Sequence, residues 1–565
     1  MLECPKMHQK LFCRNLFIWT ITLVSLLLIF AVTSTHAHEG RCGTMRLFEE
    51  LIKEKKQPHI YARKNSDYNL DSSSICTSKD YYDSVYTIET PHFQVMYALI
   101  GPHATTQAFA DSTAAIFEEA WDFYVNKLKM RKPKAPSTSL HFQKNVKEGL
   151  YPIEIIDINQ NRDNIIRVKD CSENFGITYP VDDKSQIFIE NDFFSTCSYV
   201  YNQDSIVAHG VTCLYSKPTN PLQNLVHNFS YSEKWNKGLR VTIFHEFYHA
   251  LQLSYISFYT NESFWFEASA AGFEEITTPD VDDYMRYIPS FFSRMGMPLS
   301  DTFDNYGAGT LLLYLYNHVS KDIDRHIWES YAKNPNKDFE YQLENALKPF
   351  NLDADSIFHD YSVRLAFSGN RAANIKKKDW INNDQSQWFT PNYYVRESIK
   401  PQIDKIAFEF FQVPHSFDGY YSIDFSDFIG KASIVAYRNG EAKIHKIQNT
   451  KTLDSLTALL ATSDSSTWIF SRLGKSESIP ITNSNAAPHA FPVPWKQGPL
   501  CFAPLPRDQK VFEIRTRRGD LITQEKYDGN SFCLQEDQVK SMMAPGIYRF
   551  RVGNKGKTTS FIVVY

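Results

Sequence analysis

The 565-residue sequence has little excess of charge of either sign. Its 60 Lys and Arg residues and 64 Asp and Glu residues give a net charge of -4 and a pI near 6.5. No basic stripe or charged tail interrupts this balance, so nothing in the composition indicates a nucleic-acid partner. Internal repeats and low-complexity tracts are also missing, whereas 43% of the residues are hydrophobic and 15% aromatic, as in a folded protein. A chain of this length is too long for one core and predicts roughly three domains.

Long hydrophobic runs are equally scarce, and one stands near the N-terminus. The run at residues 16–32 follows three basic residues and precedes small residues that end at Ala37. This pattern predicts a signal peptide at residues 1–37 and a secreted or cell-surface protein. The run is shorter than the ~20 residues that span a bilayer, so cleavage is favoured over the alternative, a membrane anchor formed by residues 16–32. We expect contact with the membrane through this segment alone.

Cysteines are few, and their spacing matches no zinc pattern. Two of the nine fall in the predicted signal peptide, which leaves an odd number in the exported chain. Disulfides are permitted outside the cytoplasm. Cys501 and Cys533 lie far from the other cysteines, and we expect them to pair.

The stretch from Phe244 to Gln252 contains the pattern H-E-x-x-H, formed by His245, Glu246 and His249. Residues four apart lie on one helical face, so the two imidazoles can bind one metal ion while Glu246 reaches a water beside it. The predicted helix, at about 238–258, is apolar almost all round and therefore buried. Buried histidines need partners, which zinc would supply. The alternative is a pair of hydrogen-bonded core histidines.

A second predicted helix, at about 263–276, carries Glu267, 18 residues after His249. Ala270 and Ala271 follow it at helical spacing and would let the two helices approach closely. Glu267 is therefore the expected third ligand. Glu274 lies on the same face and could orient one of the histidines, although it could also be a solvated charge at the helix end.

The rest of the pattern predicts an α+β fold. A strand at 93–97, a helix at 105–129 and strands at 139–142, 153–158 and 186–189 indicate a mixed sheet packed on helices. Residues 191–237 look rich in loops. Further helices are expected at about 280–293, 306–320, 323–333, 338–347 and 353–368.

The flanking segments divide the chain further. Residues 38–85 are polar and form an N-terminal extension or a propeptide. Residues 370–390 read as a linker. Short alternating runs then predict a β-sandwich-like domain at 390–487 and a second β domain at 500–565.

These motifs resemble the gluzincin class of zinc metallopeptidases, in which a helix with W-x-E-G/A-x-A follows the H-E-x-x-H helix. Here it reads Trp265-Phe266-Glu267-Ala268-Ser269-Ala270. More narrowly, residues 90–97, 245–252, 265–275 and 306–309 resemble a family of secreted bacterial metalloproteases. The resemblance covers roughly residues 86–370 and implies a zincin-like fold. It also implies that Tyr306, in Tyr306-Gly307-Ala308-Gly309, holds the developing oxyanion; a Tyr packed at a helix start is the alternative.

The last module resembles the C-terminal sorting domains of the type IX secretion route. The matching residues include Val511-Phe512-Glu513-Ile514, the run 544–552 around Pro545-Gly546-Ile547-Tyr548, and the terminal 561–564. The resemblance implies secretion machinery as a partner. A β-sandwich without a sorting role is the alternative.

Together these features predict a secreted, monomeric zinc metallopeptidase that acts on a protein or peptide. His245, His249 and Glu267 would bind Zn2+, which lowers the pKa of a bound water toward ~7. Glu246 would act as general base and Tyr306 would stabilise the oxyanion. Two alternatives remain, a non-catalytic surface protein on a degenerate peptidase fold and a carbohydrate-binding protein whose function lies in the β modules. The sequence indicates neither the subsite preference nor endo- or exopeptidase action.

Overall fold

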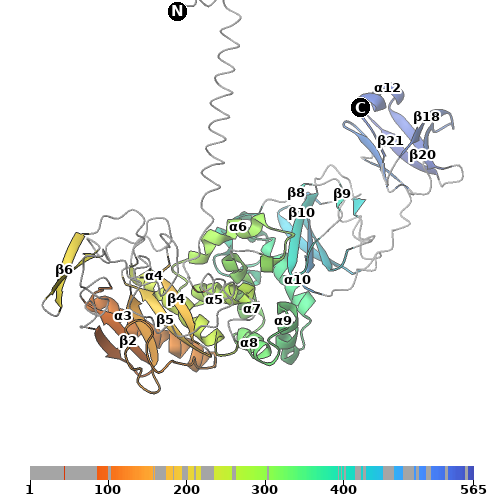
Figure 1. Ribbon diagram of the computed structural model, residues 1–565. Helices are drawn as coiled ribbons and strands as arrows, with labels where there is room; N and C mark the ends of the chain where they lie inside the picture. Colours follow the sequence, from red (N-terminus) through yellow and green to blue (C-terminus); the bar gives the residue numbers. More distant parts are fainter. Residues whose placement is uncertain are drawn as a thin grey trace, which may run out of the picture.

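The computed structural model describes one residue of the N-terminal region and most of the chain from residue 85 onward (Figure 1). The described residues are 44, 85–99, 103–156, 158, 174–181, 183–191, 193, 202–208, 211–217, 235–256, 263–301, 305–391, 394–395, 398–399, 403–413, 422–423, 428–448, 463–474, 489–491, 495–503, 505, 511–527, 532–553 and 558–564. The predicted signal peptide and all of the 38–85 extension except Thr44 and Val85 lie outside them. Within them, no helix is both long and apolar enough to cross a bilayer.

The fold is α+β, as expected, and begins with a mixed sheet. Its order is β1-β2-β3-β5-β4, with parallel pairing in the middle and antiparallel pairing at both edges. The strands are β1 (Val85–Glu89), β2 (Phe93–Ala98), β3 (Tyr151–Ile156), β4 (Gly176–Val181) and β5 (Lys184–Glu190). β2 and β3 are buried along their whole length because apolar groups cover both faces of the sheet. β4 is an edge strand.

The expected strand at 139–142 does not form. The backbone N–H groups of His141 and Phe142 donate to the side chain of Glu154 on β3, at 2.9 and 2.7 Å. The loop is therefore held by a buried carboxylate rather than by a neighbouring strand, and the pairing that remains is a single bridge between Thr138 and Asn145.

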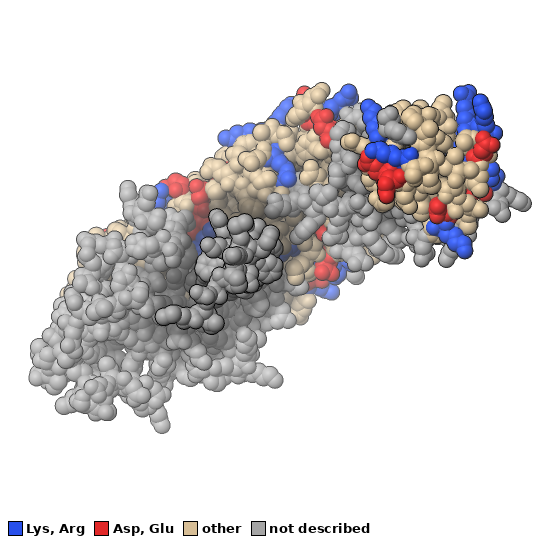
Figure 2. Space-filling model, turned by 90° about the horizontal axis from the view of Figure 1, so that it is seen from above, with Lys and Arg blue, Asp and Glu red and all other residues tan. Residues whose placement is uncertain are grey.

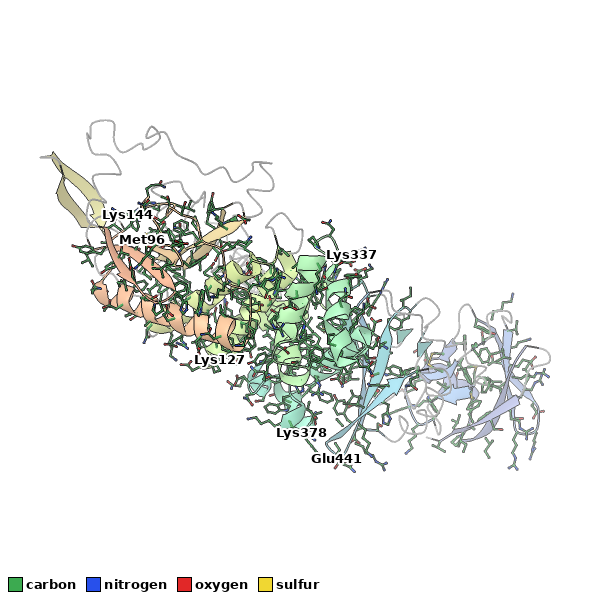
Figure 3. The ribbon with its side chains drawn as sticks, turned by 90° about the horizontal axis from the view of Figure 1, so that it is seen from below. Met96, Lys127, Lys144, Lys337, Lys378 and Glu441 are labelled. Carbon is green, nitrogen blue, oxygen red and sulfur yellow. A yellow bond between two sulfur atoms is a disulfide. The ribbon has the colours of Figure 1, made fainter. Side chains whose placement is uncertain are left out.

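Helices cover one face of this sheet (Figures 1 and 3). α3 (Gln107–Trp121) begins at Thr106, whose side chain caps it, and continues as a π-helical turn, η2 (Asp122–Lys127). Behind it lie α4 (Trp235–Gln252) and α5 (Ser263–Thr277). The helices that follow are α6 (Ile288–Ser293), α7 (Gly309–His318), α8 (Ile323–Lys333), α9 (Phe339–Leu347) and α10 (Ala354–Leu365). Their positions confirm the predicted series of helices.

Two segments differ from the sequence-based expectation. The region expected to be loop-rich contains an antiparallel hairpin of β6 (Asn202–Ala208) and β7 (Val211–Lys217). The expected linker at 370–390 instead packs on the core, with Ile381 and Trp388 buried. The indole N–H of Trp388 donates to the hydroxyl of Tyr284 at 2.8 Å, which ties this segment to η3 (Asp283–Tyr287), the short helix that follows α5.

The first β-rich module is a five-stranded sheet of order β13-β12-β14-β10-β8. Its strands are β8 (Tyr394–Val395), β10 (Ala407–Val413), β12 (Lys431–Arg438), β13 (Glu441–Ile447) and β14 (Ser465–Arg472), with Glu441 near the tip of the β12–β13 hairpin (Figure 3). One face packs on α10, where the ring of His359 contacts the hydroxyls of Ser433 and Ser471 at 2.8 and 2.7 Å. Buried residues of this sheet, such as Val435 and Ile469, belong to the same core as the helices.

The C-terminal module has a core of its own, built from two sheets. One contains β15 (His489–Phe491), β16 (Leu500–Ala503) and β19 (Phe532–Leu534), and the other β17 (Val511–Thr516), β18 (Leu521–Lys526), β20 (Gly546–Val552) and β21 (Thr558–Val563). The ring of Phe502 on β16 packs 4.9 Å from that of Phe550 on β20. A disulfide joins Cys501 to Cys533, which confirms the expected pair. Basic and acidic side chains intermingle on this module in the face shown in Figure 2.

Candidate metal centre

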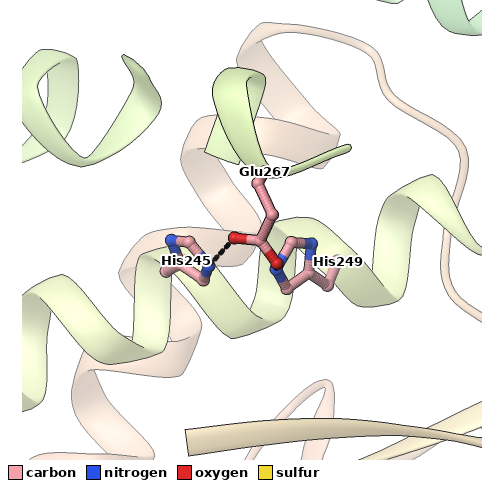
Figure 4. Close-up of side chains that lie close together, drawn as sticks. All are labelled: His245, His249 and Glu267. Carbon is pink, nitrogen blue, oxygen red and sulfur yellow. Dashed lines mark ion pairs between the residues drawn. The ribbon is translucent and has the colours of Figure 1, made fainter. Parts of the chain in front are cut away.

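Two helices bring His245, His249 and Glu267 together in the interior (Figure 4). His245 and His249 lie one turn apart on α4, and Glu267 projects toward them from the first turns of α5. All three side chains are buried. Nε2 of His245 lies 3.3 Å from Oε2 of Glu267, and Nε2 of His249 lies 3.4 Å from Oε1.

The separations between these atoms fit a tetrahedral zinc ion. Zinc bonds to His nitrogen and carboxylate oxygen of ~2.0–2.1 Å place neighbouring ligands about 3.3 Å apart. Nε2 of His249 and both carboxylate oxygens of Glu267 are buried and make no hydrogen bond within the described residues. Leaving three such atoms without a hydrogen bond or a metal ion would be costly. Two nitrogens and one oxygen are also a usual donor set for zinc with an open fourth position.

The charge state of Glu267 is also suited to binding a metal ion. Burial by itself would raise the pKa of this carboxyl, but the neighbouring imidazoles of His249 and His245 outweigh burial and bring the pKa below its usual range. Glu267 is therefore anionic at neutral pH, as a metal ligand must be.

A second set of contacts fixes both imidazole rings. Nδ1 of His245 lies 2.5 Å from Oε1 of Glu274, the residue expected to orient one of the histidines. Nδ1 of His249 lies 2.7 Å from Oε1 of Gln252, whose amide donates in turn to the backbone of Phe266 on α5. Each ring therefore presents Nε2 to the centre. Gln252 was not predicted, although its position three residues after His249 is the signal that could have found it.

Glu246 lies beside the histidines, between α4 and the edge strand β4. Its Oε2 accepts hydrogen bonds from the hydroxyls of Thr44, at 3.0 Å, and Thr178, at 2.7 Å. The backbone N–H of Thr178 donates to the hydroxyl of Thr44 at 2.8 Å. Gly176 makes room for the carboxylate, since a Cβ there would lie 2.5 Å from Cγ of Glu246. No local pattern in the sequence marks these three partners.

Tyr306 reaches the centre from η5 (Asn305–Ala308), the turn before α7. Its hydroxyl lies 3.5 Å from Nε2 of His245, and the two rings are nearly parallel. Glycines allow this approach, because a Cβ on Gly309 would lie 2.8 Å from the backbone nitrogen of Gly272 on α5. The structure therefore places the hydroxyl of Tyr306 beside a candidate ligand, and its role toward an oxyanion stays a prediction.

A buried aspartate, which was not predicted, links the two helices of the centre. Asp324 on α8 accepts a hydrogen bond from the indole of Trp265 on α5 at 2.8 Å and one from the hydroxyl of Tyr248 on α4. Burial raises the pKa of Asp324 well above its ordinary value. This contact fixes the relative position of α4 and α5, and hence of the three candidate ligands.

The fold and site define an α+β protein with a buried His-His-Glu cluster. No protein-family model matches the sequence, and no curated protein matches it. Among solved structures, the chain is similar to PorZ, described as an essential bacterial surface component of the type-IX secretion system of Porphyromonas gingivalis. The match has 17% identity and a TM-score of 0.13, and covers 17% of this chain and 14% of the PorZ chain. The sorting role of residues 500–565 stays a prediction.

Proposed function

We propose that this chain is an exported zinc-dependent peptidase. The observation that carries the proposal is the group of three buried side chains, His245, His249 and Glu267, whose facing atoms lie 3.3 and 3.4 Å apart. Zinc, when bound by them, would act as a Lewis acid toward a water molecule and the scissile carbonyl.

The remaining residues have distinct roles in this proposal. Glu246 takes a proton from the attacking water and passes it to the leaving amine. Both described hydrogen bonds to its carboxylate go to Oε2, so Oε1 is the atom that we assign to the water. The hydroxyl of Tyr306 donates to the oxyanion that develops on the substrate carbonyl. Glu274 and Gln252 hold the two imidazoles in one tautomer and orientation.

The position of β4 supports a peptide as the substrate. β4 is an edge strand, and its residue Thr178 directly contacts the proposed base. The N–H of Thr178 donates away from the sheet, to Thr44. An extended peptide that takes the place of Thr44 can add to such an edge through main-chain hydrogen bonds, which would place its carbonyl groups beside Glu246.

The proposed export rests on residues 1–37 as a signal peptide. For residues 500–565 we propose a sorting role, supported by a separate two-sheet module with its own core and disulfide. Deleting these residues should then leave peptide hydrolysis intact while it retains the protein inside the producing cell.

Metal analysis and cleavage of a peptide library test the catalytic proposal. The parent protein should contain one zinc per chain and cleave peptides, whereas Glu246→Gln should keep the zinc and lose at least ~10²-fold in rate. Glu119→Gln, at an exposed residue paired with Arg240, is the matched control and should behave like the parent. A parent that binds zinc but cleaves no peptide would instead support a non-catalytic surface protein.

A further inference from the structure

Three carboxylates meet at the far end of α5, away from the His-His-Glu cluster. Glu275 lies in the last turn of α5, Asp282 in the loop that follows, and Asp384 immediately before η9 (Gln385–Gln387). One oxygen from each lies within 4.8 Å of the other two. The fold therefore brings acidic groups from distant parts of the chain to one point, where like charges repel.

Glu275 is buried, with 4% of its surface exposed. Its Oε1 accepts a hydrogen bond from the amide of Asn382 at 2.9 Å, but its Oε2 has no partner within the described residues. Oδ1 of Asp282 is likewise buried and unpartnered among them. A buried carboxylate oxygen without a donor is costly, so these two atoms indicate a missing positive group.

The described residues supply little positive charge to this cluster. Lys237 is the cation that acts on Asp282, but its ammonium pairs with Asp280, at 3.3 Å. Burial, together with the charges of Asp384 and Asp282, raises the pKa of Glu275 to about 8 despite the hydrogen bond from Asn382. Burial and the neighbouring acids also raise the pKa of Asp282.

We propose that Glu275, Asp282 and Asp384 bind a divalent cation of the calcium type. All three donors are oxygens, which calcium prefers and which are a poor set for zinc. Backbone carbonyls and water would complete the 6–8 ligands that calcium takes. The site is separate from the His-His-Glu cluster and does not depend on the proposed peptidase activity.

The cation would hold the end of α5 against the segment that contains Trp388. Asn382, which contacts Glu275, also donates to the hydroxyl of Tyr284 at 3.1 Å, and Trp388 contacts the same hydroxyl. Glu274, the neighbour of Glu275, contacts His245. Calcium would therefore stabilise the helix that carries Glu267 and Glu274 without touching the zinc ligands.

Thermal unfolding of the full chain tests this site. The protein is freed of metal on a chelating resin, reloaded with one equivalent of zinc, and melted with and without millimolar calcium. Calcium should raise the Tm of the parent by several degrees, because a ligand that binds the folded state alone stabilises it. Glu275→Gln and Asp384→Asn should lose most of this rise, whereas Glu119→Gln, at an exposed acid outside the cluster, should keep it.

Terbium, a luminescent substitute for calcium, gives a second measurement. Emission excited through the nearby Trp388 should appear in the parent and disappear on addition of calcium. If Glu275→Gln does not fold, the site can still be tested with Asp384→Asn, because Asp384 is partly exposed. The proposal is overturned if calcium leaves both the Tm and the terbium signal of the parent unchanged. Glu275 would then hold a proton and donate it to a neighbouring carboxylate.

Discussion

Nδ1 of His245 lies 2.5 Å from Oε1 of Glu274, and both side chains are buried between α4 and α5. The contact joins a candidate zinc ligand to a carboxylate that is seven residues beyond Glu267 on the other helix. A carboxylate in this position fixes the tautomer of the imidazole and makes Nε2 a better electron donor.

Glu274→Gln should therefore weaken zinc binding without removing it. We expect a loss of ~10–100-fold in affinity, because the amide keeps the shape of the side chain but not its charge. Competition with a chromophoric chelator measures this loss. Zinc affinity equal to that of the parent would show that the contact is structural only. His249→Ala, which removes a ligand, should lose zinc altogether.

Tyr306→Phe should lower kcat and leave KM nearly unchanged. A hydroxyl that donates to the oxyanion stabilises the transition state more than bound substrate, and such donors contribute ~10²–10³-fold to kcat. Zinc content should stay the same, since the hydroxyl lies 3.5 Å from His245 and is not a ligand in our proposal. If KM rises while kcat holds, Tyr306 binds substrate and takes no part in oxyanion stabilisation.

Gly176→Ala should displace the proposed general base. The added Cβ would lie 2.5 Å from Cγ of Glu246 and 2.7 Å from Cγ2 of Thr242, so the helix or the strand must shift. We expect slower turnover with zinc retained, and a loss of ~1–3 kcal/mol in stability from overpacking. Peptide cleavage and urea unfolding measure the two effects. Gly546→Ala, where the nearest atoms lie 3.8 Å away, is the control that should change neither.

His359 predicts how the free energy of unfolding depends on pH. Burial lowers the pKa of His359 to about 3, and the nearby Lys446 and Lys431 act in the same direction. The unfolded chain takes up a proton near pH ~6.5 and the folded chain does not, so stability falls as pH drops from ~6.5 toward 3, by about 1.4 kcal/mol per pH unit. His359→Gln, which keeps hydrogen-bonding groups for Ser433 and Ser471, should flatten this slope. Urea unfolding at pH 5 and 7 measures this dependence. If the free energy of unfolding changes equally with pH in the parent and in His359→Gln, the prediction is wrong.

Much of the centre could be predicted because helical spacing is local. Four residues separate His245 from His249, and seven separate Glu267 from Glu274, so each pair lies on one face of one helix whatever surrounds it. Helical spacing did not locate Tyr306, which was predicted from the resemblance alone, because its approach depends on the glycine contact between α5 and α7.

The partners of Glu246 could not be predicted, because they come from distant elements. Thr178 lies 68 residues before Glu246 and Thr44 lies 202 residues before it. Nothing in the local sequence around a threonine in a strand or in a polar segment indicates that it will bind the carboxylate of Glu246. The error at 370–390 has a similar cause. Trp388 is buried against Tyr284, 104 residues earlier, a contact that the local sequence of the expected linker does not indicate.

The contact of α10 with the five-stranded sheet of the first β-rich module limits where the chain can be truncated without loss of stability. His359 bonds to two strands of that sheet, and Val435 and Ile469 share the core of the helices. A fragment that stops at residue 370 would expose this apolar face to solvent and invite aggregation. The smallest soluble fragment that keeps the His-His-Glu cluster intact should therefore extend to about residue 474.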